Sequence, residues 1–260
     1  MERLPTVFLS HGSPLHAIDA GDAGRAWEAL AASLPRPRAV LIASAHWDTQ
    51  LPMLTGGAAL QTIHDFSGFP PELHRVRYDA PGSPALAARA AELLKAAGNT
   101  PAINGCRGID HGAWVPLKWM YPRRDVPVVQ LSVQSALDAA HHLRVGEALA
   151  PLRDEQVLVI GSGHVTHNLR DRASHEGAAQ PAAYAVRFAS WLGERLAGGD
   201  RAALVAWREE APDAARAHPS PEHFLPLFVA LGAAGHEARA TRLYAAIEAG
   251  ALAMDAYRFD

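Results

Sequence analysis

Short apolar runs alternate with longer helical patterns along the whole sequence, and this alternation most strongly constrains the fold. The apolar runs cover residues 6–10, 39–44, 127–133 and 156–160. Runs this short and this apolar are typical of strands buried on both faces of a sheet. The clearest helical pattern begins at Ser83, an N-cap, with Pro84 in the first turn, and it stops at Gly98. The other helical patterns cover about residues 24–34, 136–150, 180–197 and 221–231.

This order predicts a three-layer α/β/α sandwich around a largely parallel or mixed central sheet. No repeat, low-complexity tract or shift in composition divides the chain, so we expect a single domain over residues 1–260. Hydrophobic residues make up 49% of the chain and charged residues 20%, which suits a globular protein and argues against a disordered one.

The charge balance and the apolar segments narrow the class of partner. A net charge of -3 provides no basic excess to neutralise phosphates, so nucleic acid is not expected as a partner. No apolar stretch approaches the roughly 20 residues that span a bilayer, and no signal peptide is recognisable. We therefore expect no membrane partner and a cytoplasmic location. The sequence is compatible with an oligomer.

The chain has 14 histidines but a single cysteine, Cys106. One cysteine excludes an internal disulfide and any multi-cysteine metal cage, and we expect Cys106 to be an inert, partly buried thiol. A metal site in this chain would have to use nitrogen and oxygen donors.

Several histidines stand where ligand sites form in open α/β sheets, beyond the carboxyl ends of the strands. Those that follow or end a predicted strand are His11, His46, His164 and His167. His111 lies in a glycine-flanked loop, and His218 and His223 lie at the start of the last helical pattern. A single histidine at a strand end is more often structural. Several on one rim indicate a metal site, because imidazoles are costly to bury without partners.

The remaining histidines lack this placement, and we assign them no role, although His64 is a weak candidate for the pocket. They are His16, His64, His74, His141, His142, His175 and His236. The adjacent His141 and His142 fall within a predicted helix, so we expect them to be solvated.

The last helical pattern offers two candidate ligands. Ser220 suits an N-cap and Pro221 the first helical position, which would put Glu222 and His223 in the first turn. Successive helical residues point about 100° apart, so both cannot face one metal ion comfortably. The positive end of the helix would keep His223 neutral and able to coordinate, so we favour His223, with Glu222 as the alternative.

Three familiar sequence motifs for nucleotide binding or catalysis are absent. The Gly161–Ser162–Gly163 turn lacks the third glycine of a dinucleotide fingerprint, since Thr166 stands at that position. No glycine–lysine phosphate loop is present, and no serine is flanked by glycines two residues away on both sides, as a nucleophile elbow requires.

Six segments together resemble the class III extradiol ring-cleavage dioxygenases, specifically the 4,5-DOPA dioxygenase-like branch related to the catalytic subunit of protocatechuate 4,5-dioxygenase. They occur in the family's order over nearly the whole chain. The segments are residues 11–14 (HGSP), 44–47 (SAHW), 65–70 (DFSGFP), 108–117 (GIDHGAWVPL), 161–169 (GSGHVTHNL) and 218–226 (HPSPEHFLP).

The resemblance implies an extradiol dioxygenase-like catalytic domain with a mononuclear non-haem Fe(II) site that uses O2 to open a catechol ring. By motif position His11 and His46 would be ligands. His223 would be the third, where better-known relatives use a carboxylate. His167 would be the acid/base and a possible additional ligand, and His111 would hydrogen-bond the substrate. His164 departs from the pattern, so its role is open.

Two other functions stay open at this stage. Three histidines also make a good Zn(II) site, so purified protein could carry zinc, and a zinc-dependent hydrolase using metal-bound hydroxide is the alternative. The third hypothesis is a non-catalytic protein that binds a metal or an aromatic ligand. It rests only on aromatic residues that could equally pack in the core, namely Trp47, Phe66, Phe69 and Trp114.

Overall fold

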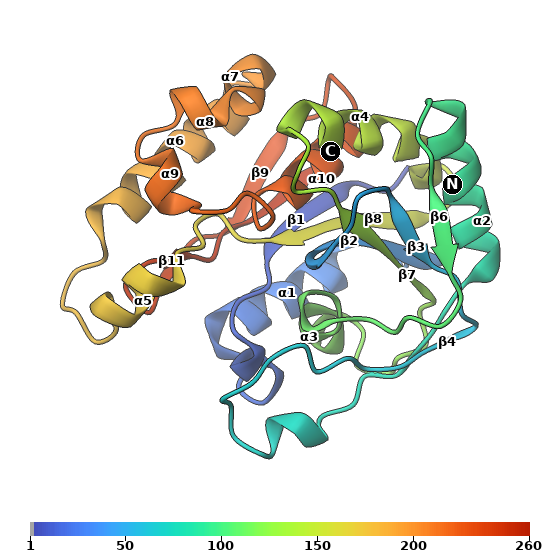
Figure 1. Ribbon diagram of the computed structural model, residues 1–260, viewed down its shortest axis with the longest axis horizontal. Helices are drawn as coiled ribbons and strands as arrows, with labels where there is room; N and C mark the ends of the chain where they lie inside the picture. Colours follow the sequence, from blue (N-terminus) through green and yellow to red (C-terminus); the bar gives the residue numbers. More distant parts are fainter. Residues whose placement is uncertain (1–2) are drawn as a thin grey trace.

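The computed structural model describes residues 3–260 and is built around a mixed eight-stranded sheet (Figure 1). From one edge to the other the strands are β6 (Ala102–Asn104), β3 (Met53–Thr55), β7 (Val128–Val133), β2 (Ala39–Asp48), β8 (Val157–Gly163), β1 (Thr6–Ser10), β12 (Ala256–Phe259) and β9 (Ala240–Tyr244). The central four, β7, β2, β8 and β1, are mutually parallel, whereas β3 and β12 pair antiparallel to their inner neighbours.

The central strands are buried on both faces, as their composition predicts. Alternate residues of β2 face opposite layers, so that Val40 and Ile42 join one apolar core while Leu41 and Ala43 join another. Parallel strands need helical coverage on both sides, because neither face of the sheet can be left to water.

Helices supply that coverage. One face is covered by α1 (Gly21–Ser33) and α3 (His111–Met120), below the sheet in Figure 1. The other is covered by α2 (Pro84–Ala96), α4 (Ala139–Leu149), α6 (Ala183–Ala197) and α10 (Leu225–Ala234). Shorter helices are α5 (Leu169–His175), α7 (Arg201–Val205), α8 (Trp207–Glu210) and α9 (Ala214–Ala217). The predicted three-layer sandwich is confirmed.

The remaining elements are short. Three 3-10 turns are η1 (Pro14–Ala17), η2 (Leu73–Arg75) and η3 (Ala150–Arg153). Two small antiparallel pairs join β4 (Ala59–Leu60) to β5 (Ala80–Pro81) and β10 (Ile247–Glu248) to β11 (Leu252–Ala253). No helix within residues 3–260 is both long enough and apolar enough to cross a membrane.

The predicted start of the last helix is wrong. We placed it at Ser220–Pro221, but residues 221–224 form a turn and α10 begins at Leu225. The hydroxyl of Ser220 donates to the Glu222 carboxylate (Oγ–Oε1 2.9 Å) instead of capping a helix. His223 therefore lies in the turn before α10, and the positive end of a helix is not what keeps it neutral.

Two predictions of exposure are also wrong. His142, expected to be solvated, is fully buried, because its ring links the β7–α4 connection. Its Nε2 accepts from the Gln134 N–H (3.1 Å), and its Nδ1 donates to the Asp138 carbonyl (2.8 Å). Cys106, expected to be partly buried, is exposed in a loop whose amides bind the Asn104 side chain.

Candidate metal centre

Three histidines from distant parts of the chain meet at the carboxyl end of the parallel strands. His11 directly follows β1, His46 lies near the end of β2, and His223 lies in the turn before α10. The Nε2 atoms of His11 and His46 are 3.0 Å apart, and those of His46 and His223 are 3.3 Å apart. One ligand atom from each of the three lies within 4.8 Å of the other two.

The second ring nitrogen of each histidine faces an oxygen. His11 Nδ1 lies 3.1 Å from the Ser162 hydroxyl, which itself donates to the Gly112 carbonyl and so must accept from His11. His46 Nδ1 lies 3.5 Å from a carboxylate oxygen of Asp65. His223 Nδ1 lies 3.0 Å from the Glu222 carboxylate.

These contacts favour a proton on each Nδ1, so three Nε2 lone pairs converge on one point. Lone pairs this close repel one another unless a cation lies between them. Nitrogens that share one metal ion at about 2.1 Å are separated by about 3 Å, which matches the two measured spacings. The donor set therefore fits a metal ion held by three imidazoles.

Burial keeps the three imidazoles neutral. It is the main cause that lowers the pKa of His11, His46 and His223 well below the usual value, and the neighbouring histidines lower it further. Neutral imidazole is the form that binds a metal, so no proton has to be displaced from Nε2 near neutral pH.

The glycines at the end of β8 pack against the backbone of the segment that carries His223. A Cβ on Gly161 would lie 2.1 Å from the Pro226 carbonyl oxygen, and a Cβ on Gly163 would lie 2.0 Å from that of His223. The close approach lets the His164 N–H donate to the His223 carbonyl (2.7 Å). The backbone that carries His223 is thereby fixed against β8.

His111 stands beside the three histidines at the first position of α3. Its Nδ1 and its main-chain N–H each lie 2.9 Å from a different oxygen of the Asp65 carboxylate. Its ring centroid is 3.9 Å from that of His46. Asp65 thus holds His111 and His46 together. Burial alone would raise the pKa of Asp65, but hydrogen bonding and attraction from His111 lower it to about 2.

His167 lies against the ring of His223. The two rings are stacked, with centroids 3.4 Å apart and planes 10° from parallel. Burial, with repulsion from His111, lowers the pKa of His167 to about 4, so its imidazole is neutral near pH 7. One ring nitrogen of His167, one of His223 and a Glu222 oxygen also lie within 4.8 Å of one another, a group separate from the one formed by His11, His46 and His223.

His164 is buried beside His11, with ring centroids 4.9 Å apart. Its Nε2 accepts from the Gly12 N–H (3.1 Å), so the proton of the neutral ring lies on Nδ1, a buried nitrogen with no hydrogen-bond partner in residues 3–260. His164 therefore anchors the turn that follows His11.

A cavity of about 190 Å3 is lined by five of these histidines, but not by His223. Phe66 and Phe69 line it, whereas Trp47 and Trp114 do not: Trp47 stacks under Arg107, and the buried Trp114 donates to the Ile63 carbonyl. The full lining is His11, Gly12, Ser13, Pro14, His46, Phe66, Phe69, His111, His164, His167, Leu169, Arg172 and Leu252.

Two histidines that the sequence placed near the pocket are structural. His64, the weak candidate, does not line the cavity, and its Nε2 donates to the Val76 carbonyl (2.9 Å). His218 is fully buried among aromatic rings and its Nε2 donates to the Val165 carbonyl (2.8 Å).

Comparison with known proteins identifies the family. Residues 5–251 match the family described as the catalytic LigB subunit of aromatic ring-opening dioxygenase. The chain belongs to this family. It is 43% identical over 259 residues to the 4,5-DOPA dioxygenase extradiol of Beta vulgaris, covering 98% of this chain and 96% of the relative. It is 40% identical to the Escherichia coli K12 protein of the same name, covering 97% and 93%.

A solved structure has the same fold as this chain. An uncharacterized protein of Escherichia coli K12 superposes with a TM-score of 0.82 at 35% identity, covering 99% of this chain and 100% of that one. The chain is therefore a class III extradiol aromatic ring-opening dioxygenase of the 4,5-DOPA dioxygenase branch. Dioxygenases of this family use a metal, a small aromatic substrate and O2. Nothing favours the hydrolase alternative.

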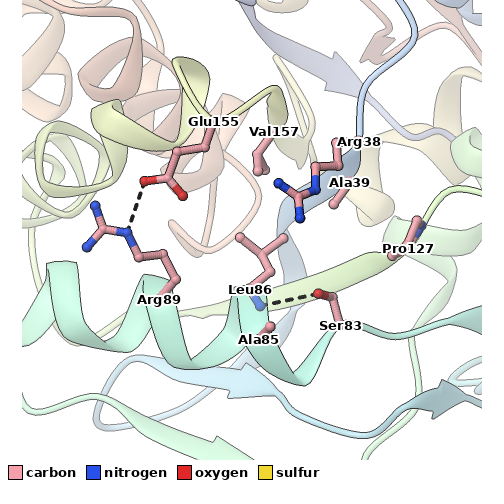
Figure 2. Close-up of a pocket in the computed structure, with 9 residues that line it drawn as sticks. All are labelled: Arg38, Ala39, Ser83, Ala85, Leu86, Arg89, Pro127, Glu155 and Val157. Carbon is pink, nitrogen blue, oxygen red and sulfur yellow. Dashed lines mark hydrogen bonds and ion pairs between the residues drawn. The ribbon is translucent and has the colours of Figure 1, made fainter.

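A second cavity, of about 360 Å3, lies at the opposite ends of the dioxygenase's parallel strands (Figure 2). Arg89 Nε donates there to the Glu155 carboxylate (2.9 Å), and Ser83 Oγ accepts from the Leu86 N–H (3.2 Å) to cap α2. None of its nine lining residues, all within the described chain, is a histidine. The contacts of Arg89 and Ser83 stabilise the fold at this end of the sheet.

Sequence reasoning missed the oxygen partners of the dioxygenase's histidines. All three lie in matched segments: Asp65 and Ser162 received no role there, and Glu222 was considered as an alternative metal ligand. Spacing along the chain gives no signal for these contacts, since Ser162 is 151 residues from His11. Only the position of Asp65 in a family segment could have drawn attention to it.

Proposed function

We propose that His11, His46 and His223 hold a single Fe(II) ion and that this enzyme opens the ring of a catechol next to its hydroxyl groups. The observation that carries the proposal is the convergence of three Nε2 atoms whose Nδ1 atoms face oxygen acceptors. The ligands come from positions 11 to 223, so we propose that the whole chain acts as one catalytic domain.

When bound, iron(II) would supply adjacent open positions for both catechol oxygens and for O2, which a three-ligand site leaves free. The three neutral histidines bring no negative charge, so a catecholate would supply the charge that the ion lacks. The same donors suit Zn(II), as in other three-histidine sites, and purified protein could carry that metal.

His167 is proposed as the acid/base. It faces the cavity in its neutral form and can accept the proton of a catechol hydroxyl and return it later. Such proton transfer is typically worth about 10²–10⁴-fold in rate. His111 presents Nε2 to the cavity because Asp65 occupies its Nδ1, and we propose that it hydrogen-bonds a substrate oxygen.

The cavity walls suit one aromatic ring. Phe66 and Phe69 lie edge-to-face with centroids 5.4 Å apart, and Leu169, Leu252 and Pro14 complete an apolar wall. A ring placed there would leave its two oxygens toward the histidines and exclude water from them. The relatives named 4,5-DOPA dioxygenase extradiol support a catechol ring as the reacting group.

The test is oxygen uptake by protein loaded with Fe(II) under anaerobic conditions and then mixed with a panel of catechols. We expect one O2 consumed per catechol and a new yellow chromophore, and only background uptake by the zinc form. Iron-loaded protein that turns over no catechol in a broad panel contradicts the proposal.

Variants separate the roles. His46→Ala should lose metal, whereas His167→Ala should keep metal and lose about 10²–10⁴-fold in kcat. His64→Gln is the matched control, because its ring binds the main chain outside the cavity. Equal metal loss in His46→Ala and His167→Ala would make His167 a ligand instead.

A further inference from the structure

One charged side chain other than histidine lines the substrate cavity. Arg172, on α5, lines the same cavity as His11, His46 and His111. No Asp, Glu or Lys is among the lining residues of the described chain. The side chain of Arg172 is 32% exposed, so it is partly buried where it lines the cavity. A cation in this position attracts an anionic group on whatever occupies the cavity.

Arg172 is weakly engaged by the protein itself. Its ion pair is with Glu176, one helical turn later, at 3.8 Å, and the Glu176 side chain is 65% exposed. An exposed pair of this kind is screened by water and contributes little. By contrast, the neighbouring Asp171 is firmly paired with Arg216 at 2.7 Å. The guanidinium of Arg172 is thus available to a ligand.

The carboxylates nearest the histidines are committed elsewhere. Asp65 binds His111, and Glu222 binds His223 and Ser220. The cavity therefore holds a cation for a carboxylate but no free carboxylate for an ammonium group, as far as its described lining extends. This asymmetry discriminates among catechols by the charge of their side chain.

Resting on the proposed ring cleavage, we propose that Arg172 binds a carboxylate on the side chain of the substrate and makes the enzyme select catechols that carry a carboxylate over neutral and cationic ones. The planar guanidinium can donate two parallel hydrogen bonds to a carboxylate, which a lysine ammonium cannot. Arg172 would thereby orient the ring with its hydroxyls toward the histidines.

The test compares kcat/KM for 3,4-dihydroxyphenylpropionate, 4-methylcatechol and dopamine in the iron-loaded enzyme and its variants. Wild type should prefer the carboxylate over the neutral catechol, and dopamine should be the poorest. Arg172→Met keeps the apolar stem and should lower kcat/KM for the carboxylate by roughly tenfold, mostly through KM, while leaving 4-methylcatechol unchanged. Arg172→Lys should fall between the two.

Arg170→Ala is the matched control, because Arg170 lies two residues earlier on the same helix and lines a different, outer hollow. It should leave the preference unchanged. An equal loss for charged and neutral catechols in Arg172→Met would show a structural role and overturn the inference. Wild type without preference for the carboxylate would also overturn it, while leaving ring cleavage intact.

Catechol binding to the zinc-loaded protein tests the role of Arg172 without turnover. The dissociation constant of 3,4-dihydroxyphenylpropionate should rise roughly tenfold in Arg172→Met, and that of 4-methylcatechol should not change. This result supports recognition of the carboxylate by Arg172 even if no catechol is cleaved. A lack of cleavage would count only against the proposed function. Unchanged affinity for the carboxylate contradicts the inference.

Discussion

Replacing Asp65 by asparagine should weaken metal binding although Asp65 is not among the three proposed ligands. Both of its carboxylate oxygens accept, one from the His111 N–H and the other from the His111 ring, and the second lies 3.5 Å from His46 Nδ1. An amide has a single acceptor oxygen, so Asp65→Asn must direct its NH2 group at one of these N–H donors. The tautomer and the orientation of His46 are then no longer fixed.

The structure gives the size of the effect. Burial opposes ionisation of Asp65, yet the contacts with His111 lower its pKa from 3.8 to about 2, which corresponds to at most about 2 kcal/mol of preference for the carboxylate, reduced further by solvent screening at this partly exposed residue. Loss of such a partner behind a metal-binding histidine typically costs about 10–100-fold in metal affinity, an effect of similar size.

The assay is competition between the protein and a chelator of known affinity for Fe(II) under nitrogen. Asp79→Asn is the matched control, since Asp79 accepts from the Thr62 N–H and hydroxyl (2.9 and 2.8 Å). We expect a weaker metal complex in Asp65→Asn and an unchanged one in Asp79→Asn. Equal metal affinity in wild type and Asp65→Asn would refute the reasoning about tautomers.

Two further substitutions test the packing at Gly163 and the burial of the His142 imidazole. Gly163→Ala should lower the free energy of unfolding by about 1–3 kcal/mol and weaken metal binding, because its Cβ would displace the His223 carbonyl; Gly105→Ala, which meets nothing within 4 Å, should do neither. Burial lowers the pKa of His142 from 6.5 to about 4. Between these pH values the unfolded chain binds a proton at His142 and the folded chain does not. The free energy of unfolding should therefore fall by up to about 3 kcal/mol as the pH drops from 6.5 to 4. Urea unfolding of metal-free His142→Gln should show a shallower fall across that range, and an equally steep one would contradict this assignment.

The central strands were predictable because each contains a short, buried apolar run. The outer strands were not. β9 has three exposed residues in five, and β12 pairs antiparallel beside β1, so neither shows the continuous apolar run that marks the centre of the sheet. The start of α10 was missed because Ser220 uses its hydroxyl for Glu222.

The cluster of histidines was predictable for a geometric reason. Residues that follow parallel strands must reach the same edge of the sheet, so His11 and His46 come together whatever the loops do. Their oxygen partners could not be predicted, since a contact such as that between Ser162 and His11 depends on the register of β1 beside β8. Arg172 was missed because nothing in the sequence shows which side of α5 faces the cavity.

The central claim is that one metal ion is shared by three imidazoles, and counting metal equivalents tests it most directly. Titration of apoprotein with Fe(II) under nitrogen should end at one equivalent per chain. The tight binding should be lost in each of His11→Ala, His46→Ala and His223→Ala, and kept in His64→Gln. Undiminished binding of the first equivalent in any of the three alanine variants would contradict the account.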